Sequence, residues 1–287
     1  MDILVTGANG QLGSEIKRIA SNGAAHNFTF VDIAEMDLGS DEAIIQYFQN
    51  KHFDFVINCA AYTAVDKAEE ERTLAYRVNA DAVKAIAEIC REKGIRLIHI
   101  STDYVFDGRG NQPIASSTVP NPLSVYGKSK LAGEQHVLNT LSNAYIIRTA
   151  WVYSSFGKNF VKTIARFAKE RETLSVVYDQ IGSPTYARDL ASAILTIIEK
   201  IGLGVDQPGI YHYTNEGVIS WYDLAVFIVK HYNLPCKVLA IPSEEYKTLA
   251  VRPNFSVLDK RKLKETFSIE IPHWHASLLE CLEELPA

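Results

Sequence analysis

The sequence predicts an α/β fold: a doubly wound parallel sheet followed by a smaller mixed α/β region. Three features of its 287 residues predict this. Short apolar segments alternate with segments of helical periodicity, which is the pattern of βαβ units. The apolar segments lack the polar alternation of a half-exposed strand, so they indicate strands buried on both faces. A glycine-rich turn joins the first apolar segment to the first helical one.

Five strands are expected in the first half, at residues 3–5, 28–31, 55–59, 97–100 and 145–147. Helical patterns lie between them and begin near Gln11, Asp41 and Thr73. In the third pattern, apolar residues recur at helical spacing until Gly94 ends the helix. These apolar residues are Val83, Ile86, Ala87 and Cys90. The pattern predicts an open sheet with helices on both faces.

The regular alternation weakens after Trp151, where prolines divide the chain into shorter pieces. They are Pro184, Pro208, Pro235, Pro242, Pro253 and Pro272. A helix beginning at Ser220 carries an apolar face, and an amphipathic helix is expected over about residues 275–285. The apolar face holds Trp221, Leu224, Ala225 and Ile228. We therefore expect a first domain of residues 1–150 and a mainly substrate-binding domain of residues 151–287, some segments of which return to the first domain.

Composition and charge argue against several classes of partner. The net charge of -5 comes with acidic and basic residues interspersed, so no basic stripe offers a nucleic acid the counterion-releasing surface that it requires. No apolar run approaches the roughly 20 residues of a membrane span, and the N-terminus lacks the pattern of an export signal. Four singly scattered cysteines indicate neither a zinc site nor a disulfide framework. We expect a soluble, cytoplasmic protein without a nucleic-acid or membrane partner.

Residues 6–13 contain a G-x-x-G-x-x-G run formed by Gly7, Gly10 and Gly13. Glycine is needed where the backbone turns tightly and where it approaches a pyrophosphate, while the next helix offers unpaired N–H groups to the phosphates. By itself such a run also fits an ordinary turn. Its place between a strand and a helix favours dinucleotide binding, and therefore a Rossmann-type first domain.

Asp32 closes the second strand about 19 residues after Gly13, where a carboxylate can accept hydrogen bonds from the adenosine ribose. The same carboxylate would repel a 2′-phosphate, which favours NADH and leaves NADPH open. The alternative is a surface aspartate at a strand end. Small residues after the third strand would let the backbone line the cofactor. The predicted cofactor contacts from these segments are Gly7, Asn9, Gly10, Gln11, Leu12, Gly13, Asp32, Asp37, Leu38, Ala60, Ala61, Tyr62, Thr63 and Asn79.

Tyr126 and Lys130 are four residues apart in a segment that begins a helix, so their side chains share one helical face. An ammonium group beside the phenol is expected to lower the phenol pKa from about 10. We predict that a reduced nicotinamide gives a hydride to a carbonyl carbon while Tyr126 protonates the carbonyl oxygen and Thr102 donates a hydrogen bond to it. Lys130 is also expected to hold the nicotinamide ribose. A tyrosine and a lysine at this spacing often occur by chance, and the glycine run favours the catalytic interpretation.

Five further segments form a pattern that extends over nearly the whole chain. They read AYTAVDKAE, STDYVFDG, YGKSKLAGE, RTAWVY and GSPT and begin at residues 61, 101, 126, 148 and 182. The pattern resembles the extended short-chain dehydrogenase/reductases and, among them, the dTDP-4-dehydrorhamnose reductase family. The resemblance implies NAD(P)H-dependent reduction of dTDP-4-dehydro-L-rhamnose to dTDP-L-rhamnose. It assigns the catalytic roles to Thr102, Tyr126 and Lys130.

The resemblance also implies a set of substrate contacts. They are Thr102, Asp103, Tyr104, Trp151 and Arg252. Trp151 is expected to cover the sugar with its indole face, and the alternative is core packing. Arg252 carries a planar donor fork that suits the substrate diphosphate, and the alternative is a solvated surface charge.

A departure from the family pattern concerns metal binding. In some members of the family that this sequence resembles, two glutamates hold a magnesium ion that joins two chains as a dimer. Glu15 matches the first glutamate, but Arg188 stands at the second position, where a cation opposes metal binding. We therefore expect no magnesium, and a monomer or a metal-independent homodimer.

Two other functions remain open. A related nucleotide-sugar epimerase or dehydratase would use the same glycine run and the same tyrosine and lysine. A non-catalytic regulatory subunit of a methionine adenosyltransferase would keep the cofactor site, although the intact set of Thr102, Tyr126 and Lys130 argues against it. The residues also leave open the choice between NADH and NADPH and, apart from the resemblance, the sugar stereochemistry and the nucleotide base.

Overall fold

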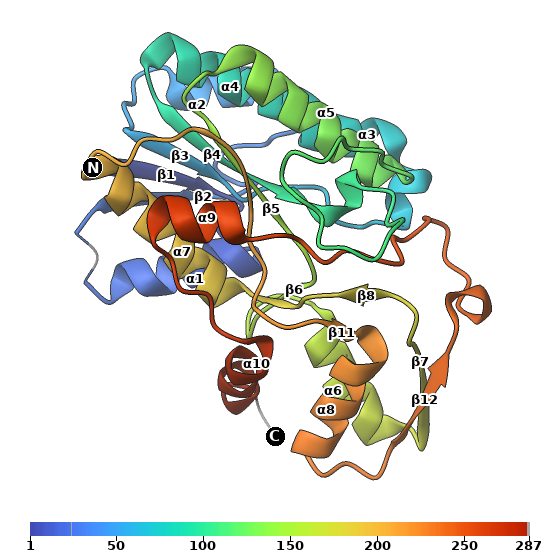
Figure 1. The fold of residues 1–287 in the computed structure, drawn as a ribbon. Coiled ribbons are helices and arrows are strands. Elements are labelled where there is room, and N and C mark those ends of the chain that lie inside the picture. Colours follow the sequence, from blue (N-terminus) through green and yellow to red (C-terminus); the bar gives the residue numbers. More distant parts are fainter. Residues whose placement is uncertain (24, 286–287) are drawn as a thin grey trace.

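The computed structural model describes residues 1–23 and 25–285. Its centre is a six-stranded parallel sheet in the order β10-β5-β4-β3-β1-β2 (Figure 1). The strands are β1 (Asp2–Thr6), β2 (Asn27–Val31), β3 (Phe55–Asn58), β4 (Arg96–Thr102), β5 (Tyr145–Thr149) and β10 (Gly209–His212). The five strands predicted in the first half are therefore confirmed, and the second half of the chain supplies the sixth.

The order of the strands reverses at β1. The second strand, β2, pairs with one edge of β1, and β3 pairs with the other, with Thr6 opposite Asn58 at the carboxyl end. In an open α/β sheet, the connections leave in opposite directions at such a point and open a crevice outside the carboxyl ends of the strands. This crevice is where a ligand site is expected.

Helices cover both faces of the sheet (Figure 1). One face packs against α1 (Gln11–Ser21), α7 (Ala187–Gly202) and α9 (Arg261–Phe267). The other packs against α2 (Asp41–Phe48), α4 (Ala82–Lys93) and α5 (Val125–Thr140). The strands bury apolar side chains on both sides, as their unbroken apolar runs predict.

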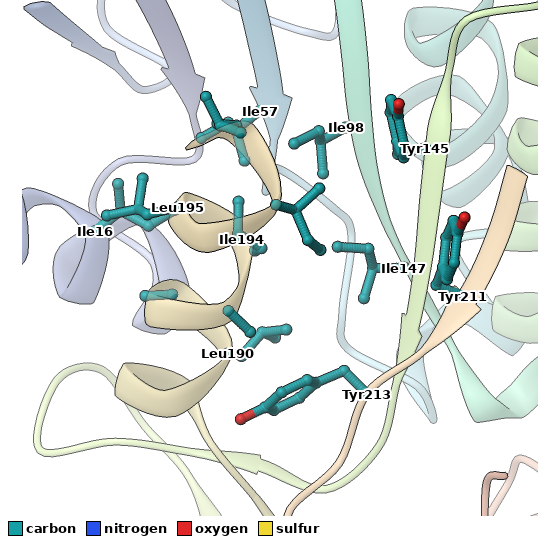
Figure 2. Close-up of a cluster of buried hydrophobic side chains, with 14 of the residues drawn as sticks. Ile16, Ile57, Ile98, Tyr145, Ile147, Leu190, Ile194, Leu195, Tyr211 and Tyr213 are labelled. Atoms are coloured by element: carbon teal, nitrogen blue, oxygen red, sulfur yellow. The ribbon is translucent and has the colours of Figure 1, made fainter. Parts of the chain in front are cut away.

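The core beneath α7 shows how this packing arises from the sequence. Figure 2 shows Leu190 and Ile194 of α7 directed toward strands β4 and β5, where Ile98 and Ile147 point back toward the helix. All four side chains are fully buried. Burying a Leu or Ile side chain contributes about 1.5–3 kcal/mol, so this cluster fixes α7 firmly on the sheet.

Strand β2 differs from the prediction that all five strands are buried on both faces. Asn27 and Thr29 are exposed, and only Val31 is buried. The reason is that β2 forms one edge of the sheet, beyond the cover of the central helices. An edge strand with one solvated side alternates as this one does.

The helix predicted from near Thr73 is built from three pieces. Helix α3 (Arg72–Tyr76) continues through a π-helical turn, η2 (Arg77–Asp81), into α4. Gly94 ends α4 in the left-handed conformation, with φ of 69°, as predicted. The π-helical turn carries Asn79, whose buried side chain is hydrogen-bonded to the backbone of Tyr62 in the loop after β3.

The second half of the chain builds a smaller α/β region at the carboxyl end of the sheet (Figure 1). Three two-stranded sheets pair β6 with β9, β7 with β12 and β8 with β11. The elements are β6 (Val152–Tyr153), α6 (Phe160–Glu170), β7 (Thr173–Val177), β8 (Ile181–Gly182), β9 (Thr185–Tyr186), β11 (Ile219–Ser220), α8 (Trp221–His231), β12 (Lys237–Ile241) and α10 (Trp274–Glu283). A cluster of buried side chains from these elements gives the region its own core.

Both helices predicted in this region are present. Helix α8 begins directly after Ser220, whose hydroxyl group accepts from the backbone of Asp223 while the Asp223 carboxylate accepts from the backbone of Ser220. Helix α10 begins one residue before the predicted position. Segments after residue 150 also return to the sheet: β10 pairs with β5, and α7 packs on α1. The domain division at residue 150 stays a prediction.

Candidate functional site

A cavity of about 820 Å³ lies outside the carboxyl ends of the central strands. It is lined from both halves of the chain, by the glycine loop, the ends of β3, β4 and β5, and the start of α5. Predicted site residues in the lining are Gly7, Gly10, Gln11, Leu12, Asp32, Asp37, Leu38, Ala60, Ala61, Thr63, Thr102, Asp103, Tyr104, Tyr126, Lys130 and Trp151. Most of the predicted site thus lies around one cavity at the reversal point of the sheet.

The glycine loop is packed too tightly for larger residues. Gly7 has φ of 65°, and a Cβ there would lie 2.8 Å from the backbone of Ala60. A Cβ on Gly13 would lie 2.7 Å from the Cα of Ala8. Gly10 is the N-cap of α1 and has no side chain to cap the helix, so the first N–H groups of α1 remain available to an anion. The loop can therefore receive a pyrophosphate.

Asp32 is held beside this loop at the end of β2. Its Oδ2 accepts a hydrogen bond from the backbone N–H of Asn9 (2.8 Å), and its Oδ1 accepts one from the backbone N–H of Ile33 (2.9 Å). Asp37 and Leu38 line the same end of the cavity. This arrangement presents a carboxylate where the adenosine ribose of a dinucleotide would lie.

Four predicted cofactor residues lie outside the lining of the cavity: Asn9, Gly13, Tyr62 and Asn79. The hydroxyl of Tyr62 donates to Glu71 (2.6 Å) instead of facing the cavity. Asn79 is fully buried; its Oδ1 accepts from the N–H of Tyr62 (2.9 Å), and its Nδ2 donates to Tyr62 O (3.1 Å). In the structure, Asn79 therefore fixes the loop after β3 through the backbone of Tyr62. Gly13 allows the first turn of α1 to pack closely against the glycine loop that precedes it.

Tyr126 and Lys130 both face the cavity from the first turns of α5. Ser124 caps this helix by accepting from the N–H of Gly127, so the segment turns helical just before Tyr126. The Lys130 Nζ donates to the carbonyl oxygen of Ile100 (2.7 Å) and lies 3.4 Å from Nε2 of His99. The predicted placement on one helical face is present, but the described contacts of Lys130 are with β4.

The predicted lowering of the Tyr126 pKa is wrong for the protein without ligand. Burial raises the pKa of Tyr126 well above its ordinary value, and a hydrogen bond with Thr102 only partly opposes it. Burial also lowers the pKa of Lys130 to about 8, against the pull of Glu134. Removal from water penalises the charged form of both groups, and this effect outweighs their proximity in sequence.

Thr102 and Asp103 lie where β4 ends and a short 3₁₀ helix, η3 (Asp103–Val105), begins. The Thr102 hydroxyl donates to Oδ1 of Asp103 (3.0 Å) and accepts from the backbone N–H of Tyr104 (3.2 Å). Both side chains are buried. Burial raises the pKa of Asp103 to about 6, although the Thr102 and Ser256 hydroxyls oppose the rise.

A buried polar chain behind Lys130 was missed by sequence reasoning. The Thr6 hydroxyl donates to Oδ1 of Asn58 (2.7 Å), and Nδ2 of Asn58 lies 3.1 Å from Nδ1 of His99, whose other nitrogen faces Lys130. Burial and then the Lys130 charge keep the pKa of His99 well below its ordinary value. The one available signal was a histidine in an otherwise apolar strand.

The side chains of Trp151 and Arg252, which were predicted to contact the substrate, are both engaged with other residues of the protein. Trp151 lines the cavity, but its ring is stacked on Trp221, with 3.6 Å between the ring centres and a backbone φ of 50°. Arg252 lies outside the lining, and its Nη2 donates to Oδ2 of Asp66 (2.8 Å). The predicted phosphate-binding cation is therefore paired with a carboxylate in this structure.

The position at which the resemblance places a magnesium ion in other family members holds a network of charges around one buried carboxylate, Glu15. Glu15 is fully buried, accepts from the Ser154 hydroxyl (2.6 Å) and pairs with Arg18. Arg188 lies 3.9 Å from Glu15 and pairs with Glu284. Two guanidinium groups on one carboxylate do not fit a magnesium site. Among residues 1–23 and 25–285, no group of three or more His, Cys, Asp or Glu side chains is placed to hold a metal ion.

Comparison with known proteins gives concordant matches over the whole chain. The family model described as RmlD substrate binding domain matches residues 1–286. A dTDP-4-dehydrorhamnose reductase from Aggregatibacter actinomycetemcomitans is 39% identical, covering 96% of each chain. The crystal structure of such a reductase from Clostridium acetobutylicum gives a TM-score of 0.93 at 40% identity, and the Bacillus anthracis reductase in complex with NADP gives 0.92 at 37%; both comparisons cover 99% of each chain.

Proposed function

The chain belongs to the RmlD substrate binding domain family, and from this membership we propose that it reduces the 4-keto group of dTDP-4-dehydro-L-rhamnose with NAD(P)H. The observation that carries the proposal is the meeting of Thr102, Tyr126 and Lys130 with the glycine loop around one cavity. The cavity must hold a dinucleotide and a sugar nucleotide together, and it extends from the glycine loop to residues of the second half of the chain. The product is dTDP-L-rhamnose.

The cofactor would lie along the glycine loop. The free N–H groups at the start of α1 and the close approach permitted by Gly7 suit a pyrophosphate. Asp32 would accept from the adenosine ribose, and Lys130 would hold the nicotinamide ribose at the other end. The family uses NAD(P)H, and the Bacillus anthracis relative was solved with NADP.

The raised pKa of Tyr126 suits the direction of reduction. When bound, the reduced nicotinamide supplies the hydride that the carbonyl carbon receives. Tyr126 keeps its proton at neutral pH because burial disfavours the phenolate, so it enters the reaction as an acid and donates the proton to the carbonyl oxygen. Lys130 would then stabilise the phenolate that this transfer leaves behind.

The substrate would occupy the part of the cavity next to Thr102, Asp103, Tyr104 and Trp151. For Arg252 to neutralise the diphosphate, its guanidinium must exchange the Asp66 carboxylate for phosphate oxygens. Bidentate pairing with phosphate is a favourable exchange for arginine. We therefore retain Arg252 as a proposed substrate contact that forms only when substrate binds.

We also propose that the protein works in the cytoplasm, as a monomer or as a homodimer that needs no metal. The four cysteines are free, which fits a reducing compartment. The Glu15 carboxylate is paired with Arg18 and lies near Arg188, and these two cations oppose the binding of a bridging magnesium ion. In the part of the chain that the structure describes, no helix is both long and apolar enough to span a membrane.

The decisive experiment incubates the purified protein with dTDP-4-dehydro-L-rhamnose and either NADPH or NADH. Loss of the reduced nicotinamide absorbance with formation of dTDP-L-rhamnose is the expected result. Product formation without net cofactor oxidation would point to an epimerase instead. Binding of cofactor without any turnover, together with co-purification of a methionine adenosyltransferase, would favour the regulatory-subunit alternative.

A further inference from the structure

Three buried polar side chains form a ladder across the central sheet. Thr6 of β1 lies opposite Asn58 of β3, and Asn58 lies opposite His99 of β4. Side chains at paired positions of neighbouring parallel strands share one face of the sheet. Here it is the face that α5 covers, because the residue two positions earlier in each strand belongs to the core on that side. The ladder therefore ends at Lys130 of α5, whose Nζ lies 3.4 Å from Nε2 of His99.

The hydrogen bonds of this ladder run in one direction. The Thr6 hydroxyl accepts from the backbone N–H of Ala60 (3.3 Å) and donates to Oδ1 of Asn58 (2.7 Å). The Asn58 amide therefore presents its NH₂ group to Nδ1 of His99, 3.1 Å away. A side-chain amide nitrogen only donates, so Nδ1 accepts and carries no hydrogen. In a neutral ring the hydrogen is then on Nε2, the nitrogen that faces Lys130.

Burial fixes this direction. Thr6 is 1% exposed, and Asn58 and His99 are 0% exposed, so bulk water does not replace a missing partner. If the Asn58 amide turned over, the Thr6 hydroxyl would lose the acceptor that it has among residues 1–23 and 25–285, and an unsatisfied buried donor is unfavourable. The ring itself stays neutral, because burial and then the Lys130 charge keep the pKa of His99 well below its ordinary value.

A ring N–H that faces Lys130 favours the neutral amine over the ammonium form. The Nζ atom already donates to the carbonyl oxygen of Ile100 at 2.7 Å. An ammonium group can only donate, so toward His99 it would set one N–H against another. A neutral amine has a lone pair that accepts the Nε2 hydrogen while it still donates to Ile100. Burial acts in the same direction and lowers the pKa of Lys130 to about 8.

Other titratable groups around Lys130 come from α5 and from the end of β3. Glu134 favours the ammonium form, but its carboxylate accepts two bonds from Arg148, at 2.9 and 2.6 Å. Cys59, the residue after β3, also acts on Lys130, and Tyr126 lines the same cavity. Burial raises the pKa of both the Cys59 thiol and the Tyr126 phenol, so neither changes charge near pH 8.

Resting on the proposed reductase function, we propose that His99 is a positioning residue that donates its Nε2 hydrogen to Lys130 and thereby sets the pH at which the enzyme loses the Lys130 charge. Thr6 and Asn58 hold the ring in the tautomer that makes this bond. In the proposed reaction, the ammonium form holds the nicotinamide ribose and stabilises the Tyr126 phenolate. The alkaline limit of the reduction is therefore lower than it would be without the ring N–H.

The test is the titration of Lys130 in His99→Gln. This change removes the ring N–H and brings an amide oxygen that can accept from the ammonium group. In an NMR titration of the Lys130 ε-methylene group, assigned with Lys130→Met, the midpoint should rise by at least about one pH unit from the wild-type value of about 8. The pH at which kcat/KM for the cofactor falls should rise by the same amount. A merely structural role for His99 would lower activity without moving the midpoint upward.

His212→Gln is the matched control. It makes the same substitution at another buried histidine of the central sheet, one whose Nδ1 lies 3.1 Å from the carbonyl oxygen of Ile114. Its Lys130 midpoint should stay at the wild-type value.

Asn58→Asp tests the tautomer directly. The new carboxylate keeps the shape of the amide and still accepts from Thr6, but toward His99 it can only accept. The ring hydrogen should therefore move to Nδ1, and the bare Nε2 should accept from the Lys130 ammonium group. The ¹⁵N chemical shifts of the ring should show the hydrogen on Nε2 in the wild-type protein and on Nδ1 in Asn58→Asp, with a higher Lys130 midpoint in the variant.

The outcomes distinguish this inference from the proposed function. If the wild-type protein does not reduce the substrate at any pH, the proposed function is wrong, while the two NMR measurements still test the His99 bond. If the Lys130 midpoint stays or falls in His99→Gln, or if the wild-type ring carries its hydrogen on Nδ1, the role of His99 is overturned and the function stands. The wild-type tautomer decides the matter even if the variants fail to fold.

Discussion

The Nζ atom of Lys130 lies 3.4 Å from Nε2 of His99, and both side chains are buried. Because burial lowers the Lys130 pKa to about 8, the ammonium form predominates below that pH and is lost above it. We expect kcat/KM for the cofactor to fall as pH rises through about 8. Lys130→Met should remove this step and lower kcat by about 10²-fold. Lys128→Met, on the exposed face of the same helix, should keep the wild-type profile, and a step that survives in Lys130→Met would refute the assignment.

Tyr126→Phe removes the proposed acid and keeps the ring. We expect kcat to fall by about 10²-fold or more while the Kd of the cofactor, measured by fluorescence quenching, stays unchanged. Tyr62→Phe is the control, because its hydroxyl is bonded to Glu71 outside the cavity lining. Full activity in Tyr126→Phe would rule out Tyr126 as the proton donor.

Gly13→Ala tests the close packing of the glycine loop. Its Cβ would lie 2.7 Å from Ala8 Cα, so the loop must shift and the pyrophosphate site with it. We expect the cofactor Kd to rise by at least about tenfold. Gly202→Ala, whose Cβ would meet only the end of Met1 at 3.6 Å, should bind cofactor normally. Equal affinities in the two variants would contradict a tight loop.

His212 should make stability depend on pH. Burial lowers its pKa to about 3, so the folded protein resists protonation there while the unfolded chain takes up a proton below about 6.5. Its contribution is therefore full above pH 6.5 and is lost as pH falls toward 3. Relative to His212→Gln, the wild-type free energy of unfolding should drop by about 2 kcal/mol between pH 7 and pH 5, measured by urea denaturation. A constant difference would show that His212 is not buried as a neutral ring.

The charge network at Glu15 makes a prediction about magnesium. Neither magnesium nor EDTA should change the melting temperature or sedimentation of the wild-type protein, because Arg18 and Arg188 already neutralise the carboxylate. Arg188→Glu would leave Glu15, Glu280 and Glu284 facing a fourth acid, and its melting temperature should fall and then recover when magnesium is added. A magnesium-dependent dimer of the wild-type protein would contradict this.

The order of strands and helices could be predicted because each apolar segment carries its own periodicity and each turn its own signal. The glycine loop and the pair Tyr126 and Lys130 could be predicted for the same reason, because each lies within one short segment, a single loop or a single helix. The edge position of β2 could not be read this way, because the exposure of Asn27 and Thr29 depends on which strand ends the sheet.

Features that depend on contacts between distant segments, or on how deeply a group is buried, could not be predicted from the sequence. Asp66 meets Arg252 across 186 residues, and nothing in either segment indicates the other. The direction of the Tyr126 pKa shift was mispredicted for a similar reason. Spacing along a helix predicts which groups share a face, whereas the cost of burying a charge depends on the walls of the completed cavity.

Strand β10 has a consequence for how the protein is synthesised. It pairs with β5 along residues 209–212, and α7, made just before it, covers Ile98 and Ile147. When only the first 150 residues have emerged from the ribosome, β5 is therefore an unpaired edge strand, and the apolar face of the sheet that α7 later covers is exposed to water. We therefore expect the nascent chain to be prone to aggregation until these later segments emerge. Truncation before residue 212 should consequently yield aggregates instead of a smaller nucleotide-binding protein.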